Sequence, residues 1–157
     1  MGSGGSQKIF TTVKSYSKRG QLLKRSDLQT LAESRDLDEL VTRIKNTKYL
    51  DAINSVAKPY TAEKLEIALR AKLADEQFKI AKSSGNSKIL DAFFQRFIIS
   101  NLKLILKGKI LGKSQEEISA FFNMHAEELA KQRDIVVKAL VAKDLEEAVS
   151  SLGSSPF

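Results

Sequence analysis

Cysteine is absent from this sequence of 157 residues, and only one histidine, His125, is present. Without cysteine the chain can form no disulfide and no thiolate zinc site, which fits a reducing cytoplasm. The sequence also lacks an HExxH pair and a GxxxxGK(S/T) phosphate loop. We therefore expect no catalytic residue, no cofactor and no metal ligand, and a protein that is not an enzyme. His125 is expected to be a solvated loop residue.

Long apolar runs are missing as well. The most apolar stretch, residues 93–106, is interrupted by Arg96, Ser100, Asn101 and Lys103, and it falls short of the roughly 20 residues that cross a bilayer. We expect no transmembrane segment. Residues 1–6, MGSGGS, have neither the apolar nor the charged part of a targeting signal, and we interpret them as a flexible expression scar outside the fold.

The charge is unevenly spread along the chain. The formal net charge is +7, with 22 Lys and Arg against 11 Asp and Glu up to Lys113, and 4 against 8 after it. A basic body of this kind suits nucleic acid, anionic lipid or an acidic protein partner, and equally a solvated surface with no partner.

Helical spacing covers almost every segment, and glycine is scarce, so we predict an all-α helical bundle. Two long helices, about 61–83 and 87–107, are joined by the turn SSGNS and should pack as an antiparallel hairpin, with Gly108 ending the second. Either Asn86 or Ser87 is expected to begin that second helix. Shorter helices are expected at 9–23, after Ser26, and at 36–45, 49–56, 114–123, 126–140 and 143–152.

One pattern occurs twice. DLDELVTRIKNTKY at 36–49 and DLEEAVSSLGSSPF at 144–157 align without a gap, 108 residues apart, with the same acidic first turn, apolar spacing and terminal aromatic. They are either two generic amphipathic helices or copies of a repeat unit. If they are copies, 7–140 form a first helical repeat domain and 141–157 begin a second.

The order of these motifs resembles the C subunit of archaeal A-type ATP synthases, a relative of the d subunit of V-ATPases. LLKRSDLQTLAESRDLDELVTRIKNTKYLDAI resembles the opening of a repeat in that family, and EKLEIALRAKLADEQFKI resembles its next long helix. NLKLILKGKILGKSQEEISAFF is similar to its Asn-Leu-Lys helix, basic exit and capped short helix. Ser155-Pro156-Phe157 would hold the place of a Thr-Pro-Tyr turn, whereas Lys48 replaces the usual proline in the first copy.

The resemblance implies a mechanical role. It predicts a non-catalytic central-stalk adapter that links the membrane rotor ring to the central shaft and transmits torque for proton or sodium transport. Its partners would be the central shaft subunits and the proteolipid rotor ring, and it would lie in the cytoplasm, peripheral on the membrane through the complex. The family has three such repeats, so the chain would be an N-terminal fragment.

A few polar residues are candidates for interactions. Asn101 falls on an apolar stripe and, if buried, must be hydrogen-bonded, most simply in a bond that fixes helix register. Acidic pairs such as Glu127-Glu128 stand at helix starts, where carboxylates favour the helix dipole. Five cations form a basic surface on the second long helix and just beyond it: Arg96, Lys103, Lys107, Lys109 and Lys113. This surface either binds an acidic partner or phosphates, or is a solvated face with no partner.

A helical nucleic-acid-binding module that uses this basic face is the alternative function, although no aromatic stacking platform is evident. Titrating the chain with mixed duplex and single-stranded DNA over a range of salt concentrations distinguishes the stalk adapter from the nucleic-acid-binding module. We expect no nucleic-acid partner, and hence no micromolar binding that falls steeply with salt. Such binding would favour the alternative.

Overall fold

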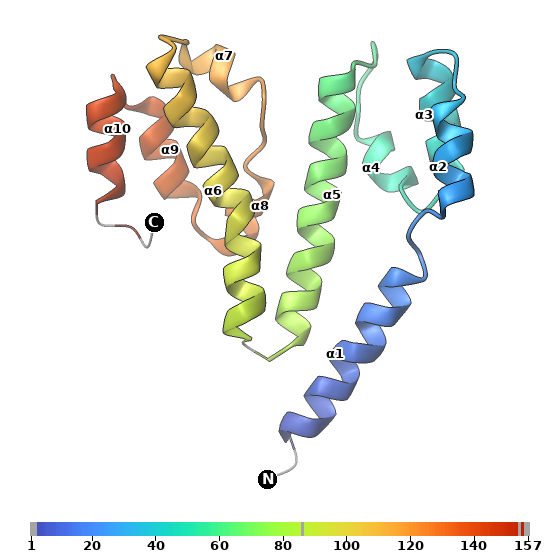
Figure 1. The fold of residues 1–157 in the computed structure, drawn as a ribbon. Coiled ribbons are helices and arrows are strands. Elements are labelled where there is room, and N and C mark those ends of the chain that lie inside the picture. The colour runs from blue at the N-terminus through green and yellow to red at the C-terminus, as the bar shows by residue number, and fades with distance from the viewer. Residues whose placement is uncertain (1–2, 86, 154, 156–157) are drawn as a thin grey trace. The chain divides into compact units, whose positions relative to one another are not determined.

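The computed structural model describes residues 3–85, 87–153 and 155. These residues form ten α-helices and no strand, which confirms the predicted all-α class (Figure 1). In chain order the helices are α1 (Ser3–Arg19), α2 (Arg25–Ala32), α3 (Leu37–Lys45), α4 (Leu50–Asn54), α5 (Ala62–Ser83), α6 (Lys88–Ile110), α7 (Gln115–Ser119), α8 (His125–Ala130), α9 (Arg133–Val141) and α10 (Leu145–Leu152).

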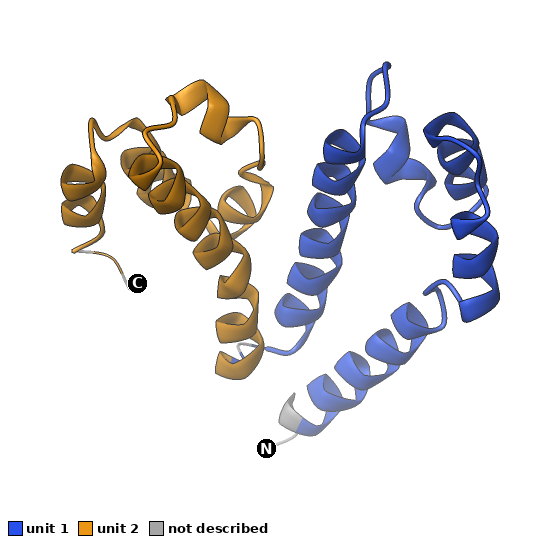
Figure 2. Cartoon of the chain, turned by 45° about the horizontal axis from the view of Figure 1, so that its top comes forward, with its two compact units in different colours: residues 1–87 blue, residues 88–157 orange. Residues whose placement is uncertain are grey.

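The chain divides into two compact units, residues 1–87 and 88–157 (Figure 2). The first unit holds α1–α5 and the second holds α6–α10. The boundary between the units falls between the two long helices, so their packing as a hairpin stays a prediction. The repeat boundary expected after residue 140 also stays a prediction, and Asn86, one of two expected starts of α6, lies outside the described residues.

The first helix is longer at its start than expected. It begins at Ser3 rather than Ile9 and ends at Arg19 rather than near Leu23, so residues 3–6 of the presumed scar are helical. The helix is held to α5 near its start, because the side chain of Gln7 donates to the carbonyl of Ser83 at 2.6 Å. Extending an anchored helix by further residues is favourable, because each added residue gains one backbone hydrogen bond.

The first unit has a small apolar core in which α3, α4 and α5 meet. Its buried members are Val41, Ile44, Ile53 and Leu65. Thr61 caps α5 by accepting a hydrogen bond from the backbone N–H of Lys64 at 3.3 Å, as its position ahead of the apolar run predicts.

The second unit is built around α6. One face of this helix buries Ile98, Leu102 and Ile105, and these side chains pack against α7 and α9 through Ile118, Val136, Ala139 and Leu140. Three fully buried branched side chains, Ile98, Ile105 and Val136, lie in this core. Because branched side chains have few rotamers, such a core holds its helices in one arrangement.

Gly108, expected to end the second long helix, instead lies inside α6. The helix continues to Ile110 and is closed by Gly112, whose φ of 65° is the left-handed conformation that favours glycine. Gly108 is buried, and a Cβ atom there would lie 2.5 Å from Cγ1 of Ile118. Its role is therefore to let α7 approach α6 closely.

The two similar stretches have the same N-terminal cap. Asp36 accepts from the backbone N–H of Glu39 at 2.8 Å, and the Glu39 carboxylate accepts from the backbone N–H of Arg35 at 3.0 Å. This bond from Arg35, with a further one from the Arg43 side chain, lowers the pKa of Glu39 to about 2. The second stretch, 108 residues later, repeats both hydrogen bonds. The backbone N–H of Glu147 donates to the side chain of Asp144 at 2.9 Å, and the backbone N–H of Lys143 donates to the carboxylate of Glu147 at 2.6 Å.

The two stretches also end alike. The hydroxyl of Thr47 donates to the carbonyl of Ile44 at 2.6 Å, and the hydroxyl of Ser155 donates to that of Leu152 at 2.7 Å. Thr47 and Ser155 are again 108 residues apart. The likeness therefore extends beyond the helix start, although Pro156 and Phe157 lie outside the described residues.

Burial distinguishes α3 from α10. Val41 is 2% exposed in the first unit, whereas its counterpart Val149 is 52% exposed. α10 packs against α9 and α6 and buries Ala148 instead. The two helices therefore share a local structure, and their burial differs at the position of Val41 and Val149.

We predict that Gly108→Ala lowers the free energy of unfolding by up to about 2 kcal/mol, because overpacking costs about 1–3 kcal/mol and the gain in helix propensity returns about 1 kcal/mol. Denaturant unfolding measures the change. In an Ile118→Ala background the same substitution should become neutral or stabilising. Gly5→Ala is the matched control, because nothing lies within 4 Å of a Cβ there. A destabilisation that persists without Ile118 contradicts the explanation.

Candidate functional site

The candidate residues predicted from sequence all lie on α6 or in the turn that follows it. The structure divides them into three sets with different surroundings. Asn101 points into the second unit, three cations lie on the outer face of α6, and two cations near its end bind neighbouring segments.

Asn101 joins α6 to α8 and to the segment before it. Its side-chain amide donates to the backbone carbonyl of Asn123 at 3.0 Å and to the carboxyl group of Glu127 at 2.8 Å. The two acceptors are contributed from 22 and 26 residues further along the chain. A single side chain on α6 therefore holds the start of α8 in place.

Glu127 is a buried acid that the sequence patterns did not single out. Its side chain is 0% exposed, and burial raises its pKa, although the hydrogen bond from Asn101 works in the opposite direction. Its second oxygen, Oε2, has no hydrogen-bond partner in the part of the chain that the structure describes. Glu127 was expected only to favour the helix dipole, as its exposed neighbour Glu128 does. The amide on the apolar stripe of α6 was the one sequence signal of a buried polar partner.

His125 is not a loop residue as expected. It is the first residue of α8, it is half-buried, and its backbone N–H donates to the side chain of Asn123 at 3.0 Å. Proximity to His125 also acts to lower the pKa of Glu127.

The basic ridge comprises Arg96, Lys103 and Lys107 on the outer face of α6. All three are exposed, and their spacing of seven and four residues aligns them along the helix. The guanidinium carbon of Arg96 lies 4.2 Å and 4.9 Å from the ring centres of Phe93 and Phe97, a cation–π arrangement that restrains the side chain. Among the described residues, no ion pair is seen for any of the three.

The other two cations make contacts inside the second unit. Lys109 is half-buried and donates to the backbone carbonyl of Ala142, in the connection between α9 and α10. Lys113, which lies just ahead of α7, pairs with Glu117 of that helix at 2.8 Å. Their ammonium groups are therefore engaged within the unit, which leaves the basic ridge as the part of the predicted set that is open to a partner.

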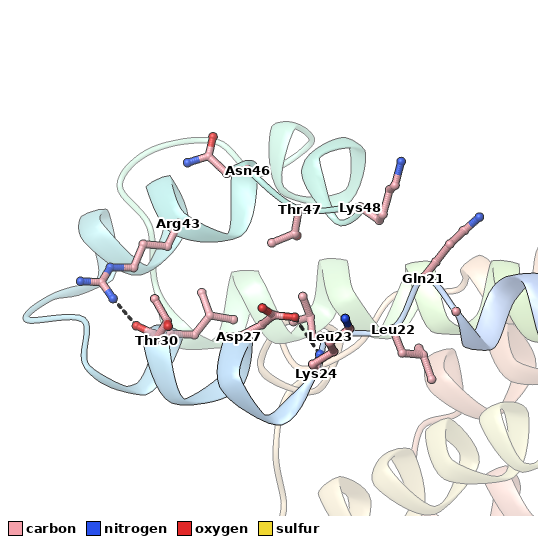
Figure 3. Close-up of a pocket in the computed structure, with 12 residues that line it drawn as sticks. Gln21, Leu22, Leu23, Lys24, Asp27, Thr30, Arg43, Asn46, Thr47 and Lys48 are labelled. Carbon is pink, nitrogen blue, oxygen red and sulfur yellow. Dashed lines mark hydrogen bonds between the residues drawn. The ribbon is translucent and has the colours of Figure 1, made fainter.

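The first unit contains an open cavity of about 550 Å³ that is lined by both polar and apolar residues (Figure 3). It lies among the connection before α2, α2 itself and the end of α3. Arg43 donates to the carbonyl of Thr30, and the backbone N–H of Lys24 donates to Asp27 at 2.8 Å. Asp27 and Arg43 are therefore hydrogen-bonded to the backbone of the cavity wall.

The described residues contain neither a metal-binding cluster nor a membrane-spanning helix. No group of three or more His, Cys, Asp or Glu in the described part of the chain could hold a metal ion. None of its helices is long and apolar enough to cross a membrane.

These features define an all-helical protein with a buried hydrogen bond between Asn101 and Glu127 and an exposed basic ridge. Residues 11–157 match the ATP synthase (C/AC39) subunit family, and the chain belongs to that family. The resemblance inferred from the motifs is thereby confirmed.

Three archaeal relatives, each named as the C subunit of an A-type ATP synthase, are similar to the chain. The protein of Methanocaldococcus jannaschii is 29% identical over 94% of this chain and 37% of its own length. The protein of Methanothermobacter thermautotrophicus is 28% identical over 83% of this chain and 35% of its own length. The protein of Archaeoglobus fulgidus is 29% identical over 88% of this chain and 40% of its own length. The chain therefore spans well under half the length of these relatives. No solved structure matches it.

We predict that Glu127→Gln changes the free energy of unfolding, compared with that of the unmodified chain, in the stabilising direction as the pH rises from 4 to 7. Burial raises the folded-state pKa of Glu127, so its contribution to stability is full below the unfolded pKa and is lost as the pH rises through the folded value. A glutamine has no proton to lose. Unfolding free energies measured across this range test the sign.

Glu128→Gln, one residue away and exposed, is the comparison variant. Because the Glu128 charge helps to raise the pKa of Glu127, its removal should change the pH dependence in the same direction as Glu127→Gln but by less. Asn101→Ala should cost about 1–3 kcal/mol, because it removes a partner of the buried carboxyl. Equal pH profiles for the two glutamine variants would contradict the account.

Proposed function

We propose that the chain acts as a non-catalytic central-stalk adapter of an A/V-type rotary ATPase, linking the membrane rotor ring to the central shaft and transmitting torque for proton or sodium transport. The observation that carries the proposal is the family match over residues 11–157. The relatives are named as subunits of an ATP synthase. As part of such a complex, the chain would lie in the cytoplasm, peripheral on the membrane through the complex.

The packing of the second unit supports a mechanical role. An adapter passes torque only if its helices do not shift against each other under load. α6 is in contact with α7, α8, α9 and α10, and its contact with α7 is close enough to need glycine at position 108. The Asn101 bonds add directional ties, which resist sliding better than apolar contacts do.

The basic ridge is the surface we assign to a partner. Its three cations project from one rigid helix, and Arg96 is already restrained by two aromatic rings. An ordered cation loses less side-chain entropy when it binds. An acidic surface on the central shaft or on the rotor ring would complement the ridge. Lys109 and Lys113 contribute by holding the end of α6 in position.

We predict that reversing the charge of Arg96, Lys103 and Lys107 to Glu weakens binding to the shaft subunits or to the detergent-solubilised rotor ring by about tenfold or more, because like charges would then face each other. Surface plasmon resonance at two salt concentrations measures the effect, which should shrink at high salt.

The matched control reverses three other exposed cations of the same unit, Lys131, Lys138 and Lys143, and so changes the net charge equally. Unchanged binding by the ridge variant would remove the ridge from the interface. Failure of the unmodified chain to bind either partner would contradict the adapter function.

A further inference from the structure

α1 turns its polar side toward its own unit. Gln7 and Thr11 both donate to the backbone carbonyl of Ser83 on α5, at 2.6 Å and 2.5 Å. One and two turns further along, Lys14 donates to the carbonyl of Lys79 at 3.2 Å and Lys18 pairs with Glu76 at 2.7 Å. The side of α1 that packs on α5 is therefore hydrogen-bonded and charged.

Four large apolar side chains lie on the rest of the helix. Ile9, Phe10, Val13 and Tyr16 are 67%, 57%, 62% and 67% exposed. Their spacing gathers them within about 120° of the helix circumference at 100° per residue. Single exposed apolar residues are ordinary, but four on one helix face form a patch that needs a partner. We call these four residues the α1 apolar face.

The charge around this face has one sign. Residues 1–26 contain no Asp or Glu and six cations, Lys8, Lys14, Lys18, Arg19, Lys24 and Arg25. Four of these are exposed: Lys8, Arg19, Lys24 and Arg25. Lys8 and Arg19 follow one flank of the α1 apolar face. The partner of the face is therefore expected to be anionic.

Pairing of α1 with α1 of a second copy does not meet this requirement, because it would bring their cations together. An anionic lipid surface does. Helices that lie in a membrane interface combine an aromatic and aliphatic face with flanking Lys and Arg, and Tyr16 is of the kind that resides at headgroup level. A single convex helix needs no preformed groove when its partner is a deformable bilayer.

We propose that α1 binds directly to an anionic membrane surface, with the α1 apolar face at the boundary of headgroups and acyl chains and with Lys8 and Arg19 at the lipid phosphates. The polar side of α1 keeps its contacts with α5, so binding requires no unfolding of the first unit. This inference goes beyond the proposed function, in which contact with the membrane is made through other subunits.

Flotation of the whole chain with vesicles tests the proposal. The vesicles contain phosphatidylcholine alone, or phosphatidylcholine and phosphatidylglycerol in equal parts. We expect binding to the anionic vesicles, weaker binding to the neutral ones, and a decrease with salt. Replacing Ile9, Val13 and Tyr16 by Gln should reduce binding by about tenfold or more, and Lys8→Glu with Arg19→Glu should reduce it selectively on anionic vesicles.

The control replaces three exposed apolar residues of the second unit, Ile89, Ile110 and Leu111, by Gln, and should bind as the unmodified chain does. The proposal is overturned by absence of binding to anionic vesicles, by equal binding to both kinds, or by an equal loss in the control. A several-degree fall in thermal midpoint for the α1 variant would show that its face packs within the protein. A dimer that this variant dissociates, or capture by an acidic protein without vesicle binding, would assign the face to those partners instead.

Discussion

The hydrogen bond between Asn101 and Glu127 lies where the Glu127 carboxyl cannot reach water. Because losing a hydrogen bond to a buried carboxyl is costly, this pair favours one register of α8 on α6. The same amide holds the carbonyl of Asn123, so the bend that leads into α8 is set as well. The apolar contacts of Ile98, Leu102 and Ile105 stabilise the second unit, while the hydrogen bonds of Asn101 position α8 within it.

α6 combines these inner contacts with the basic ridge on its outer face. Rigidity on one side and charge on the other suit the adapter role that we propose, since a flexible helix would dissipate force at its contacts. Membership of the ATP synthase (C/AC39) subunit family gives this arrangement its context. The two units carry their exposed cations on different kinds of helix. In the second unit the cations lie on α6, a helix of the core, whereas in the first unit they lie on α1 beside the α1 apolar face.

Several parts of this arrangement were accessible from residue patterns. The caps formed by Thr61 and Ser114 follow from side-chain oxygens placed just ahead of apolar runs. The helix expected after Ser26 begins at Arg25 instead, so Ser26 lies inside α2. The spacing of Arg96, Lys103 and Lys107 placed them on one face. Glu127 was missed because a carboxylate in the first turn of a helix has a sufficient local explanation, and its burial depends on α6, which lies 26 residues away in sequence at Asn101.

The sequence alone determined the helical class, the two capped acidic helices and the family, since each depends on short-range periodicity and on the order of motifs. Only the tertiary structure decided that Gly108 serves a helix contact rather than a helix end, that Val149 is exposed where Val41 is buried, and that α1 presents its polar side inward. The physical reason is that helical periodicity shows which residues share a face, whereas the packing of distant segments decides which face is covered.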